Sequence, residues 1–382
     1  MITYARAKRQ SLRFNRVNPR NSWNSIQEYL RVDATRTAHL VRAVRARNEH
    51  RSDGCDDVAV LIRDRDRHGA MRRGESLSVE LRSLVSHGLV ARRRQIATRR
   101  ATMKLATYER IRAVFASTPC DAYPDLDAIR AECPECTLDA LVSIYSQESS
   151  RKIRATHGKH VRAIEAHAKR YVLGEDVFSI AANVDFPACQ LMRLLLEYLL
   201  GVGHKSVGGV LRDPFGRIPE VPERGTPAAE YGAKLCARLR ADVERVVAWD
   251  HQASPAVDVL RHNAGKEYED LLEELLTNEG IPFVTEQDLR ADGHARTPDI
   301  KLEVPIAVKG RIVNWIDSKA SFSDPVVHVE KGTEQFQGYV NRFGPGMVIY
   351  WHGIIDELNT DPNVLLVDAF PDTKDIVKLK MI

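Results

Sequence analysis

The fold is decided by the stretch that begins at Thr297-Pro298-Asp299 and ends at Asp317-Ser318-Lys319. Between these motifs, residues 300–304 alternate apolar and charged side chains, and residues 311–316 resume a strand-like pattern after Lys309-Gly310. A period of two is typical of half-buried β-strands, and a glycine between two such runs is typical of a tight turn. The stretch therefore predicts a β-hairpin.

The predicted hairpin brings two acids and a lysine to one place. Pairing of its strands places Asp299 and Asp317 at one edge of the sheet, and Lys319 points to the same side as Asp317 because side chains alternate. Two carboxylates suit a hard divalent cation such as Mg²⁺ or Mn²⁺, and Ser318 can add a backbone carbonyl. The lysine can orient the attacking water and offset charge on a phosphate. This pattern predicts metal-assisted hydrolysis of phosphodiester bonds.

Two helices flank the hairpin in the sequence. Residues 265–276 form a helix whose leucines mark its buried face, and we predict that Glu267 supplies a third acid to the metal site. A later helix carries Gln335 and Tyr339, which are one helical turn apart and can both face the site. An alternative stays open, in which these two residues are an amide and a ring packed on the sheet.

An isolated acid-x-lysine pattern is weak evidence, but longer stretches of the chain closely resemble the codanin-interacting nuclease family. That family carries a TPD motif and belongs to the restriction-endonuclease-like PD-(D/E)XK superfamily. The resemblance begins near Lys104. The stretches that carry it are Ser143-Ile144-Tyr145-Ser146-Gln147-Glu148, Thr156-His157-Gly158-Lys159-His160, Leu211-Arg212-Asp213-Pro214, Thr297-Pro298-Asp299-Ile300, residues 315–322 and residues 335–353.

The resemblance implies a role for each residue of the predicted site. It places the catalytic acids on Asp299 and Asp317 and the catalytic lysine on Lys319. The helix acid falls on Glu267. Gln335 and Tyr339 resemble the Q-x-x-x-Y signature of RecB-like members of the superfamily. It also implies a Mg²⁺-dependent or Mn²⁺-dependent deoxyribonuclease and a codanin-like partner protein.

The 382 residues leave room for two or three domains. We predict an arginine-rich, disordered extension over residues 1–102, which an upstream error in the gene model would also explain. Residues 103–255 are expected to be a helical, helix-turn-helix DNA-binding region with a linker. Residues 256–382 are expected to be an α/β nuclease domain with a PD-(D/E)XK core.

The net charge of +4 hides a strong asymmetry along the chain. Residues 1–103 hold 23 Lys+Arg against 10 Asp+Glu, a net charge of +13, whereas residues 256–382 hold 13 against 22, a net charge of −9. An acidic domain suits metal capture but repels phosphates. The nucleic-acid contacts are therefore expected outside the nuclease domain, and the basic extension could be a nucleic-acid-binding arm, a nuclear localisation patch or a mitochondrial presequence.

Residues 104–202 show helical periodicity, with Tyr108, Ile111 and Phe115 on one face. Two segments have the layout of a short helix, a break and a longer helix. In the first, Pro134 forms the break and Thr137 is a predicted N-cap, and in the second the break is at residues 185–187. This layout is typical of helix-turn-helix units, although helical hairpins in a core look the same.

A basic run between these two units is the strongest candidate for contacts with the DNA backbone. Residues 151–170 contain seven Lys and Arg and one acid, Glu165. Such contacts neutralise phosphates and carry little sequence information, so affinity should fall steeply with salt. A solvated helix face is the alternative. The predicted contact residues are Arg151, Arg154, His157, Lys159, His160 and Arg162.

Composition narrows the remaining possibilities. The chain has no apolar run of the length of a membrane span and no secretory signal, so we expect a soluble protein of the nucleus or cytoplasm, or less plausibly the mitochondrion. Six scattered cysteines argue against a disulfide scaffold. A zinc site built from Cys133, Cys136, His157 and His160 is disfavoured because only two residues separate the histidines.

Two functional alternatives stay open at this point. The nuclease fold could be a catalytically silent scaffold that binds a codanin-like partner and nucleic acid, although intact acids and lysine favour activity. The substrate could also be RNA, and neither the preferred nucleic-acid structure nor endonuclease against exonuclease action can be predicted from the sequence. Selectivity for nucleic-acid structure rather than sequence is our expectation.

Overall fold

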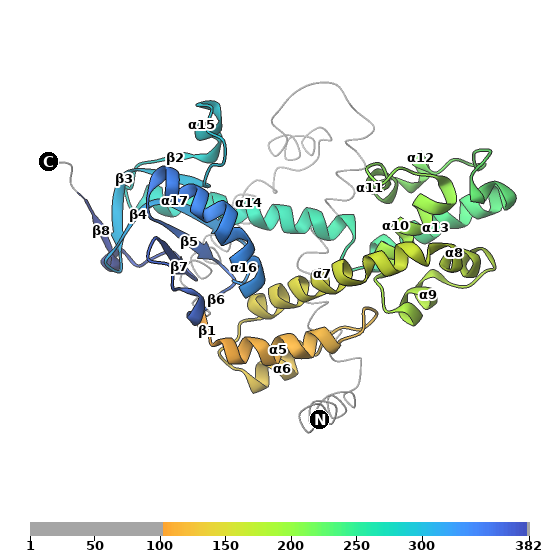
Figure 1. The fold of residues 1–382 in the computed structure, drawn as a ribbon, viewed down its shortest axis with the longest axis horizontal. Coiled ribbons are helices and arrows are strands. Elements are labelled where there is room, and N and C mark those ends of the chain that lie inside the picture. The colour runs from red at the N-terminus through yellow and green to blue at the C-terminus, as the bar shows by residue number, and fades with distance from the viewer. Residues whose placement is uncertain (1–101, 380–382) are drawn as a thin grey trace, which may run out of the picture. The chain divides into compact units, whose positions relative to one another are not determined.

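The computed structural model describes residues 102–379, which belong to one compact unit (Figure 1). Apart from Thr102, the predicted extension over residues 1–102 lies outside the described residues. Helices and a mixed β-sheet build the described part, which confirms the predicted α/β class. No helix among the described residues is both long enough and apolar enough for a membrane span.

A six-stranded sheet forms the C-terminal half. Its strand order is β2-β3-β4-β5-β7, and β8 also pairs with β3. Neighbours of β3 are antiparallel, whereas β4–β5 and β5–β7 are parallel. The strands are β2 (Phe283–Thr285), β3 (Ile300–Val308), β4 (Arg311–Lys319), β5 (Gly346–Tyr350), β7 (Val364–Val367) and β8 (Ile376–Lys378).

The predicted hairpin is confirmed as β3 and β4. Lys309 and Gly310 both have positive φ, 50° and 76°, which is the geometry of a tight two-residue hairpin turn. At its other end Ile300 pairs with Ile316. The pairing register shifts between Lys301 and Ile306, in a segment that contains Pro305, which has no N–H to donate to a neighbouring strand.

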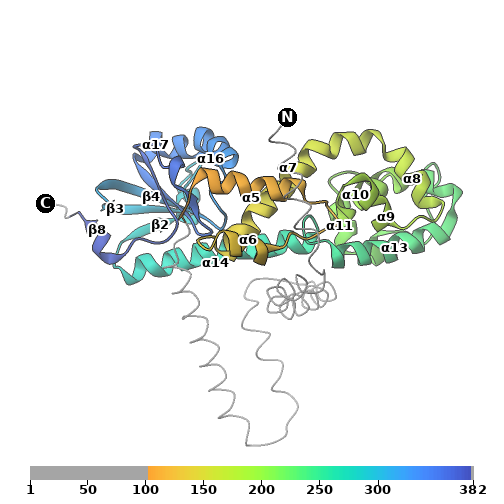
Figure 2. The same ribbon diagram turned by 90° about the horizontal axis from the view of Figure 1, so that it is seen from below.

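Helices cover both faces of the sheet. Helix α14 (Pro255–Asn278) packs on β4 from one side, and α17 (Gln337–Phe343) packs on β4 and β5. Figures 1 and 2 show the sheet between α14 and the pair α16 (Pro325–Lys331) and α17. A π-helix, η2 (Gly332–Phe336), joins α16 to α17. The remaining short elements are α15 (Glu286–Ala291), β6 (Ile354–Ile355), η3 (Asp356–Leu358) and η4 (Thr373–Asp375).

One close contact fixes the sheet beneath α17. A Cβ atom on Gly346 would lie 2.1 Å from the Trp315 ring, so only glycine fits at the start of β5. The Trp315 ring is fully buried and packs edge-on to Tyr339 at 5.1 Å between centroids. Its Nε1 donates a hydrogen bond of 2.8 Å to the carbonyl of Gly344. This packing ties β4 to α17.

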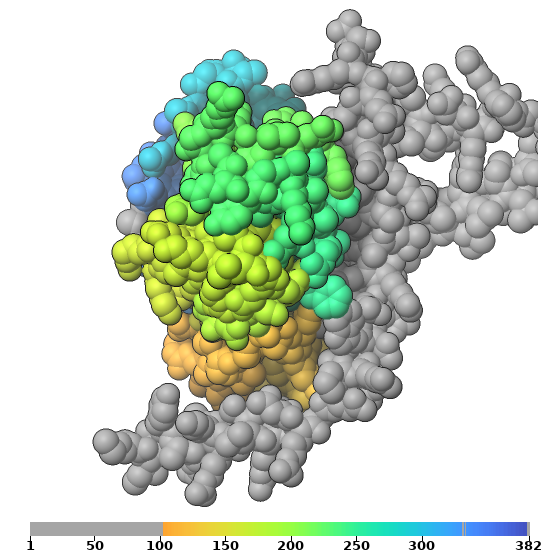
Figure 3. Space-filling view, turned by 90° about the vertical axis from the view of Figure 1, so that its right-hand side faces the viewer, coloured from red at the N-terminus to blue at the C-terminus, as the bar shows by residue number. Residues whose placement is uncertain are grey.

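Residues 105–249 form helices. Tyr108, Ile111 and Phe115 are buried on α5, as their periodicity predicted. Figure 3 views the surface formed by the helices from α7 to α13. The elements are α5 (Leu105–Ser117), α6 (Leu126–Glu132), α7 (Leu138–Arg162), α8 (Ile164–Val172), α9 (Val177–Val184), α10 (Ala188–Leu200), α11 (Val207–Arg212), α12 (Pro214–Arg217), η1 (Pro227–Glu230) and α13 (Gly232–Trp249).

Both predicted short-break-long segments are present as helix pairs. Thr137 caps α7 by accepting a hydrogen bond from the backbone N–H of Ala140. The break between α9 and α10 contains Asp185 in the left-handed conformation, with φ of 53°. The glycine- and proline-rich segment over residues 205–227 contains α11 and α12. Its Val207, Val210 and Leu211 are buried in the core of the helical region, because these apolar residues recur at helical spacing among the glycines.

The described chain begins with a strand that pairs far along the sequence. β1 (Thr102–Met103) is parallel to β6, and Met103 is buried. The Thr102 hydroxyl donates to Asp368 at 3.0 Å, and the Lys104 ammonium lies 2.7 Å from Asp356. The start of the helical region is therefore attached to the half of the molecule that contains the six-stranded sheet.

Candidate active site

The end of the hairpin gathers the three predicted groups. Asp299 immediately precedes β3, and the pairing of Ile300 with Ile316 sets it beside the last residues of β4. Its Oδ2 accepts a hydrogen bond of 2.6 Å from the backbone N–H of Ser318. Asp317 and Lys319 lie two residues apart on β4 and form an ion pair. The structure thus brings Asp299, Asp317 and Lys319 together.

The two acids sit in an environment that disfavours two negative charges. Asp317 is fully buried, and its Oδ1 has no hydrogen-bond partner. Burial first, and then the charge of Asp317, raise the pKa of Asp299 to about 8. A buried, unsatisfied carboxylate oxygen is costly unless a proton or a cation compensates for it. The pair therefore fits a bound divalent metal ion.

Lys319 remains a cation in this setting. Burial alone would lower its pKa, but the charges of Asp317 and Asp299 outweigh burial and raise the pKa above its usual range. A lysine held in its charged form cannot act as a base. It can orient a water molecule or a phosphate oxygen through its N–H groups.

Gln335 and Tyr339 reach the same site from the helix side. Gln335 lies in the π-helix η2, and its Nε2 donates a hydrogen bond of 2.8 Å to the hydroxyl of Tyr339. Burial and the charge of Asp317 raise the pKa of Tyr339, and the charge of Lys319 opposes the increase. The tyrosine therefore lies within electrostatic reach of both β4 groups. Single turns of π-helix recur at functional sites.

Ser318 contributes through its backbone rather than its side chain. Its hydroxyl accepts a hydrogen bond of 2.8 Å from Nε1 of Trp351, whose ring stacks on Tyr268 of α14. Because side chains alternate along β4, the Ser318 side chain points away from the face that carries Asp317 and Lys319. This leaves only its main-chain groups beside the acids.

The sequence of the chain matches a recognised family. Residues 235–370 match the family described as a protein of unknown function with a TPD sequence motif. The chain is 36% identical over 292 residues to CDAN1-interacting nuclease 1 of Mus musculus, which covers 72% of this chain and 96% of the relative. The chain belongs to the CDAN1-interacting nuclease family.

Other family members match over similar lengths. The protein from Homo sapiens is 35% identical over 283 residues, covering 70% of this chain and 94% of the relative. The protein from Bos taurus is 35% identical over 291 residues, covering 72% and 96%. No solved structure matches the chain. Membership therefore rests on the sequences, and the relatives are named as nucleases.

The helix acid differs from the prediction. Glu267 is exposed on α14, whereas Glu269 is partly buried and its charge contributes to the raised pKa of Asp299. Two residues span about 200° of a helix, so these two acids point to opposite sides. The structure does not bring Glu267 to the site. The buried Leu272 and Leu276, three and seven residues after Glu269, are the sequence signal that marks the correct face.

The predicted nucleic-acid residues of α7 separate into two groups. Arg154, Lys159 and Arg162 are exposed and face solvent. His157 is partly buried and lies near the Phe186 ring. Exposed cations close in sequence on one helix can approach a phosphate backbone. Contact between these three residues and DNA therefore stays a prediction.

Arg151 and His160 do not belong to that surface. The Arg151 guanidinium, 15% exposed, forms ion pairs with Glu148 and Asp324, both at 2.6 Å. His160 is 1% exposed and stacks on the Phe186 ring. Both residues make internal contacts. Asp324 and Phe186 lie outside α7, so the sequence around α7 does not reveal these partners.

Cys133 and Cys136 lie close together, with Glu135 beside them. The three potential ligand atoms lie within 4.8 Å of one another. The Arg110 side chain donates to the Cys133 sulfur at 3.6 Å, and burial raises the pKa of Cys136 to about 12. Three potential ligands are one fewer than the four that a structural zinc site uses. His160 bonds His167 rather than this group.

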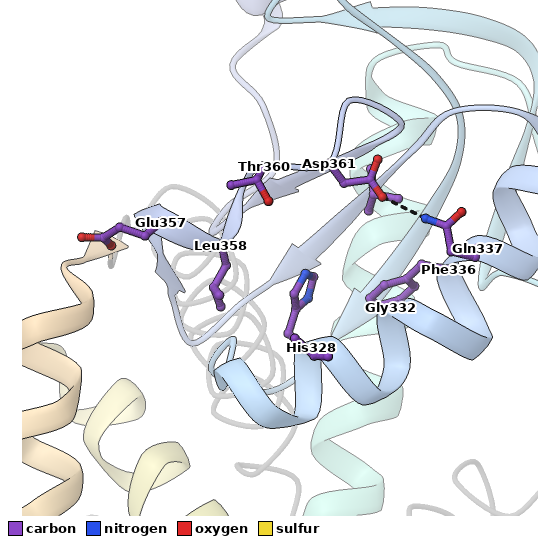
Figure 4. Close-up of a pocket in the computed structure, with 10 residues that line it drawn as sticks. His328, Gly332, Phe336, Gln337, Glu357, Leu358, Thr360 and Asp361 are labelled. Atoms are coloured by element: carbon purple, nitrogen blue, oxygen red, sulfur yellow. Dashed lines mark hydrogen bonds between the residues drawn. The ribbon is translucent and has the colours of Figure 1, made fainter.

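A pocket of about 370 Å³ lies beside the sheet but away from the acids (Figure 4). Its walls come from α16, η2 and the segment between η3 and β7, and Gln337 donates to Asp361 across one side. Asp299, Asp317 and Lys319 do not line it. A polymer substrate would not need an enclosed pocket at the reacting centre.

Proposed function

We propose that this protein is a metal-dependent nuclease of the PD-(D/E)XK type that hydrolyses DNA phosphodiester bonds. The observation that carries the proposal is the buried Asp317 carboxylate, with one unsatisfied oxygen, beside Asp299 and Lys319. An ion pair that served only to stabilise the fold would need no unsatisfied oxygen. Burying a second carboxylate beside it would also be unfavourable.

The residues suggest a division of labour. Asp299, Asp317 and the main chain of Ser318 would hold Mg²⁺ or Mn²⁺, with Glu269 nearby in place of the predicted Glu267. When bound, the ion would stabilise charge on the phosphate and lower the pKa of a bound water. Lys319 would orient the attacking water or a phosphate oxygen. Gln335 would hold the hydroxyl of Tyr339, which lies within electrostatic reach of Lys319.

The proposed reaction is the hydrolysis of a phosphodiester bond by water. A water oxygen attacks phosphorus after losing a proton to solvent, the bond from phosphorus to the sugar oxygen breaks, and the sugar oxygen takes up a proton. Lys319 offsets the negative charge that develops on the phosphate oxygens, because its ammonium is held charged by the two acids.

A cleavage panel tests this proposal. Labelled single-stranded, duplex, flapped and branched DNA, with RNA counterparts, would be incubated with the full chain and Mg²⁺ or Mn²⁺. We expect metal-dependent cleavage of DNA that Lys319→Ala abolishes and that the exposed Lys374→Ala retains. Cleavage at the wild-type rate by Lys319→Ala would refute the assignment. A preference for RNA would change the substrate from DNA to RNA and leave the metal-dependent nuclease assignment in place.

The competing function is a silent nuclease-fold scaffold for a codanin-like partner. It is favoured by the name of the relatives, which refers to interaction with CDAN1. We propose that this chain also binds such a partner, in the nucleus or cytoplasm rather than the mitochondrion. Calorimetric titration of Mn²⁺ separates the two functions, because a scaffold needs no ion. Wild type should bind Mn²⁺ and Asp299→Ala should not, whereas equal binding by both would favour the scaffold.

A further inference from the structure

The loop that follows Lys319 is held by helix α7 of the helical region. The backbone N–H of Phe322 donates a hydrogen bond of 2.8 Å to the hydroxyl of Ser143, and Gln147 Nε2 donates one of 2.9 Å to the Phe322 carbonyl. Both polar groups of this peptide segment are therefore satisfied by a helix that is more than 170 residues earlier in the chain. The Phe322 ring is fully buried and stacks on Tyr108 of α5 at 5.9 Å.

The same loop ends at a buried, multiply bonded aspartate. Asp324 is fully buried, and Arg151 Nη1 of α7 donates to its Oδ2 at 2.6 Å. The Tyr108 hydroxyl donates to the same oxygen. Its other oxygen caps α16, accepting from Val326 N–H at 3.0 Å and Val327 N–H at 3.1 Å. Asp324 therefore joins α5 and α7 to the helix that begins beside the active site.

These contacts lie on one line along α7. Ser143, Gln147 and Arg151 are four residues apart, which places all three on one face of the helix. Glu148 reinforces the last contact, because its Oε2 accepts from Arg151 at 2.6 Å and from Arg112 at 3.0 Å. The outward cations Arg154, Lys159 and Arg162 come later on the same helix.

The loop connects two parts of the candidate site. Lys319 lies five residues before Asp324, and α16 leads through η2 to Gln335 and then Tyr339. A movement of the loop would therefore displace the lysine from one side and the glutamine–tyrosine pair from the other. None of the α7 residues contacts those groups directly. Misplacement of reacting groups by about 1 Å can reduce a rate about 100-fold.

We propose that Ser143, Gln147 and Arg151 are positioning residues that hold the catalytic lysine and the Gln335–Tyr339 pair in register with the two acids. The inference rests on the proposed nuclease function and deepens it. The helical region is then part of the catalytic apparatus through the first part of α7. The exposed cations in the C-terminal part of α7 would contact nucleic acid.

The test compares two α7 variants with a matched control in the full chain. Gln147→Leu removes one hydrogen-bond donor with little change in volume, and its Oε1 has no hydrogen-bond partner to lose. Ser150→Ala is the control, because the Ser150 hydroxyl bonds only the carbonyl of Ser146 in its own helix. Arg151→Met alone would leave the buried Asp324 without its ion-pair partner. The second variant is therefore the double substitution Arg151→Met/Asp324→Asn, in which asparagine still caps α16.

We expect Gln147→Leu and the double variant to lower kcat at least tenfold while KM and metal-free DNA binding stay at wild-type values. Ser150→Ala should retain wild-type kcat. An unchanged kcat in both variants, with Lys319→Ala inactive, would overturn the positioning role but keep the nuclease. If wild type cleaves no substrate of the panel, the nuclease function and the positioning role that rests on it are both overturned.

Discussion

The end of β4 and helix α7 both carry charged residues that the sequence marks as functional, yet the two regions behave differently. On β4 the chemistry depends on strand alternation and one hairpin register, so Asp317 and Lys319 emerge beside Asp299 as predicted. On α7 seven basic and histidine side chains lie within residues 151–162, and their roles differ. Arg151 is bound to Asp324, His160 is buried, and Arg154 faces solvent.

The difference has a physical cause. A strand in a hairpin determines its neighbours through local pairing, which a turn such as Lys309-Gly310 reveals. A long helix presents a different face every residue, and the partners of each face come from distant parts of the chain. The charge of a residue in the sequence therefore does not distinguish an exposed cation from one in an internal ion pair.

The largest expected effect is at the sheet edge. Asp317→Asn should reduce DNA cleavage at least about 1,000-fold, because a metal ligand and a partner of Lys319 are lost together. Melting temperature should change little, because the charge of Asp299 remains to stabilise the Lys319 ammonium. Rates and thermal unfolding would be measured beside the exposed control Glu303→Gln. A large drop in melting temperature would mean that Asp317 has a structural role.

The exposed cations of α7 should give the next largest effect. Replacement of Arg154, Lys159 and Arg162 with glutamine should weaken DNA binding up to about 100-fold in low salt. The slope of log affinity against log salt should decrease by about 2 to 3, because three phosphate contacts are lost. Fluorescence titrations at several salt concentrations would measure both. An unchanged slope, equal to that of the exposed control Lys234→Gln, would place the DNA contacts elsewhere.

The buried histidines of the helical region should give a smaller, pH-dependent effect. Burial lowers the pKa of His160 and of His167, so the unfolded chain binds protons more readily than the folded chain near and below pH 6.5. Stability should be fully present above that pH and fall as pH decreases, by up to about 1.4 kcal/mol per pH unit for each histidine.

His160→Phe keeps a ring against Phe186 and removes one titrating group. Its unfolding free energy, measured by denaturant titration from pH 7.5 to pH 5, should fall less steeply than that of wild type. The exposed His204→Gln serves as the control and should follow wild type. Identical slopes for all three proteins would show that His160 titrates normally and is not held neutral by burial.

The smallest effect separates the two acids of α14. Glu269→Gln should weaken Mn²⁺ binding about threefold to tenfold, because its charge reaches Asp299 but it is not the principal ligand. Glu267→Gln should leave the affinity at the wild-type value, because this acid is exposed. Calorimetric titrations would compare the two. The reverse order of effects would restore the original prediction of Glu267.

Much of the nuclease half could be predicted from the sequence. The hairpin follows from a period of 2, and the spacing of Gln335 and Tyr339 follows from a period of 3.6. The hydrogen bonds that Ser143 and Gln147 make with the backbone of Phe322 could not be predicted, since partners more than 170 residues apart leave no local pattern. Asp324 gave a partial signal, because an aspartate before a proline is typical of a helix N-cap.

The pairing of β1 with β6 has a consequence for how the protein is made. Thr102 and Ile354 pair in two parallel strands. The first strand of the described chain therefore cannot pair until a segment about 250 residues later has left the ribosome. Until then Met103, buried in the finished protein, is uncovered in the nascent chain. Both segments must have left the ribosome before this pair of strands can form.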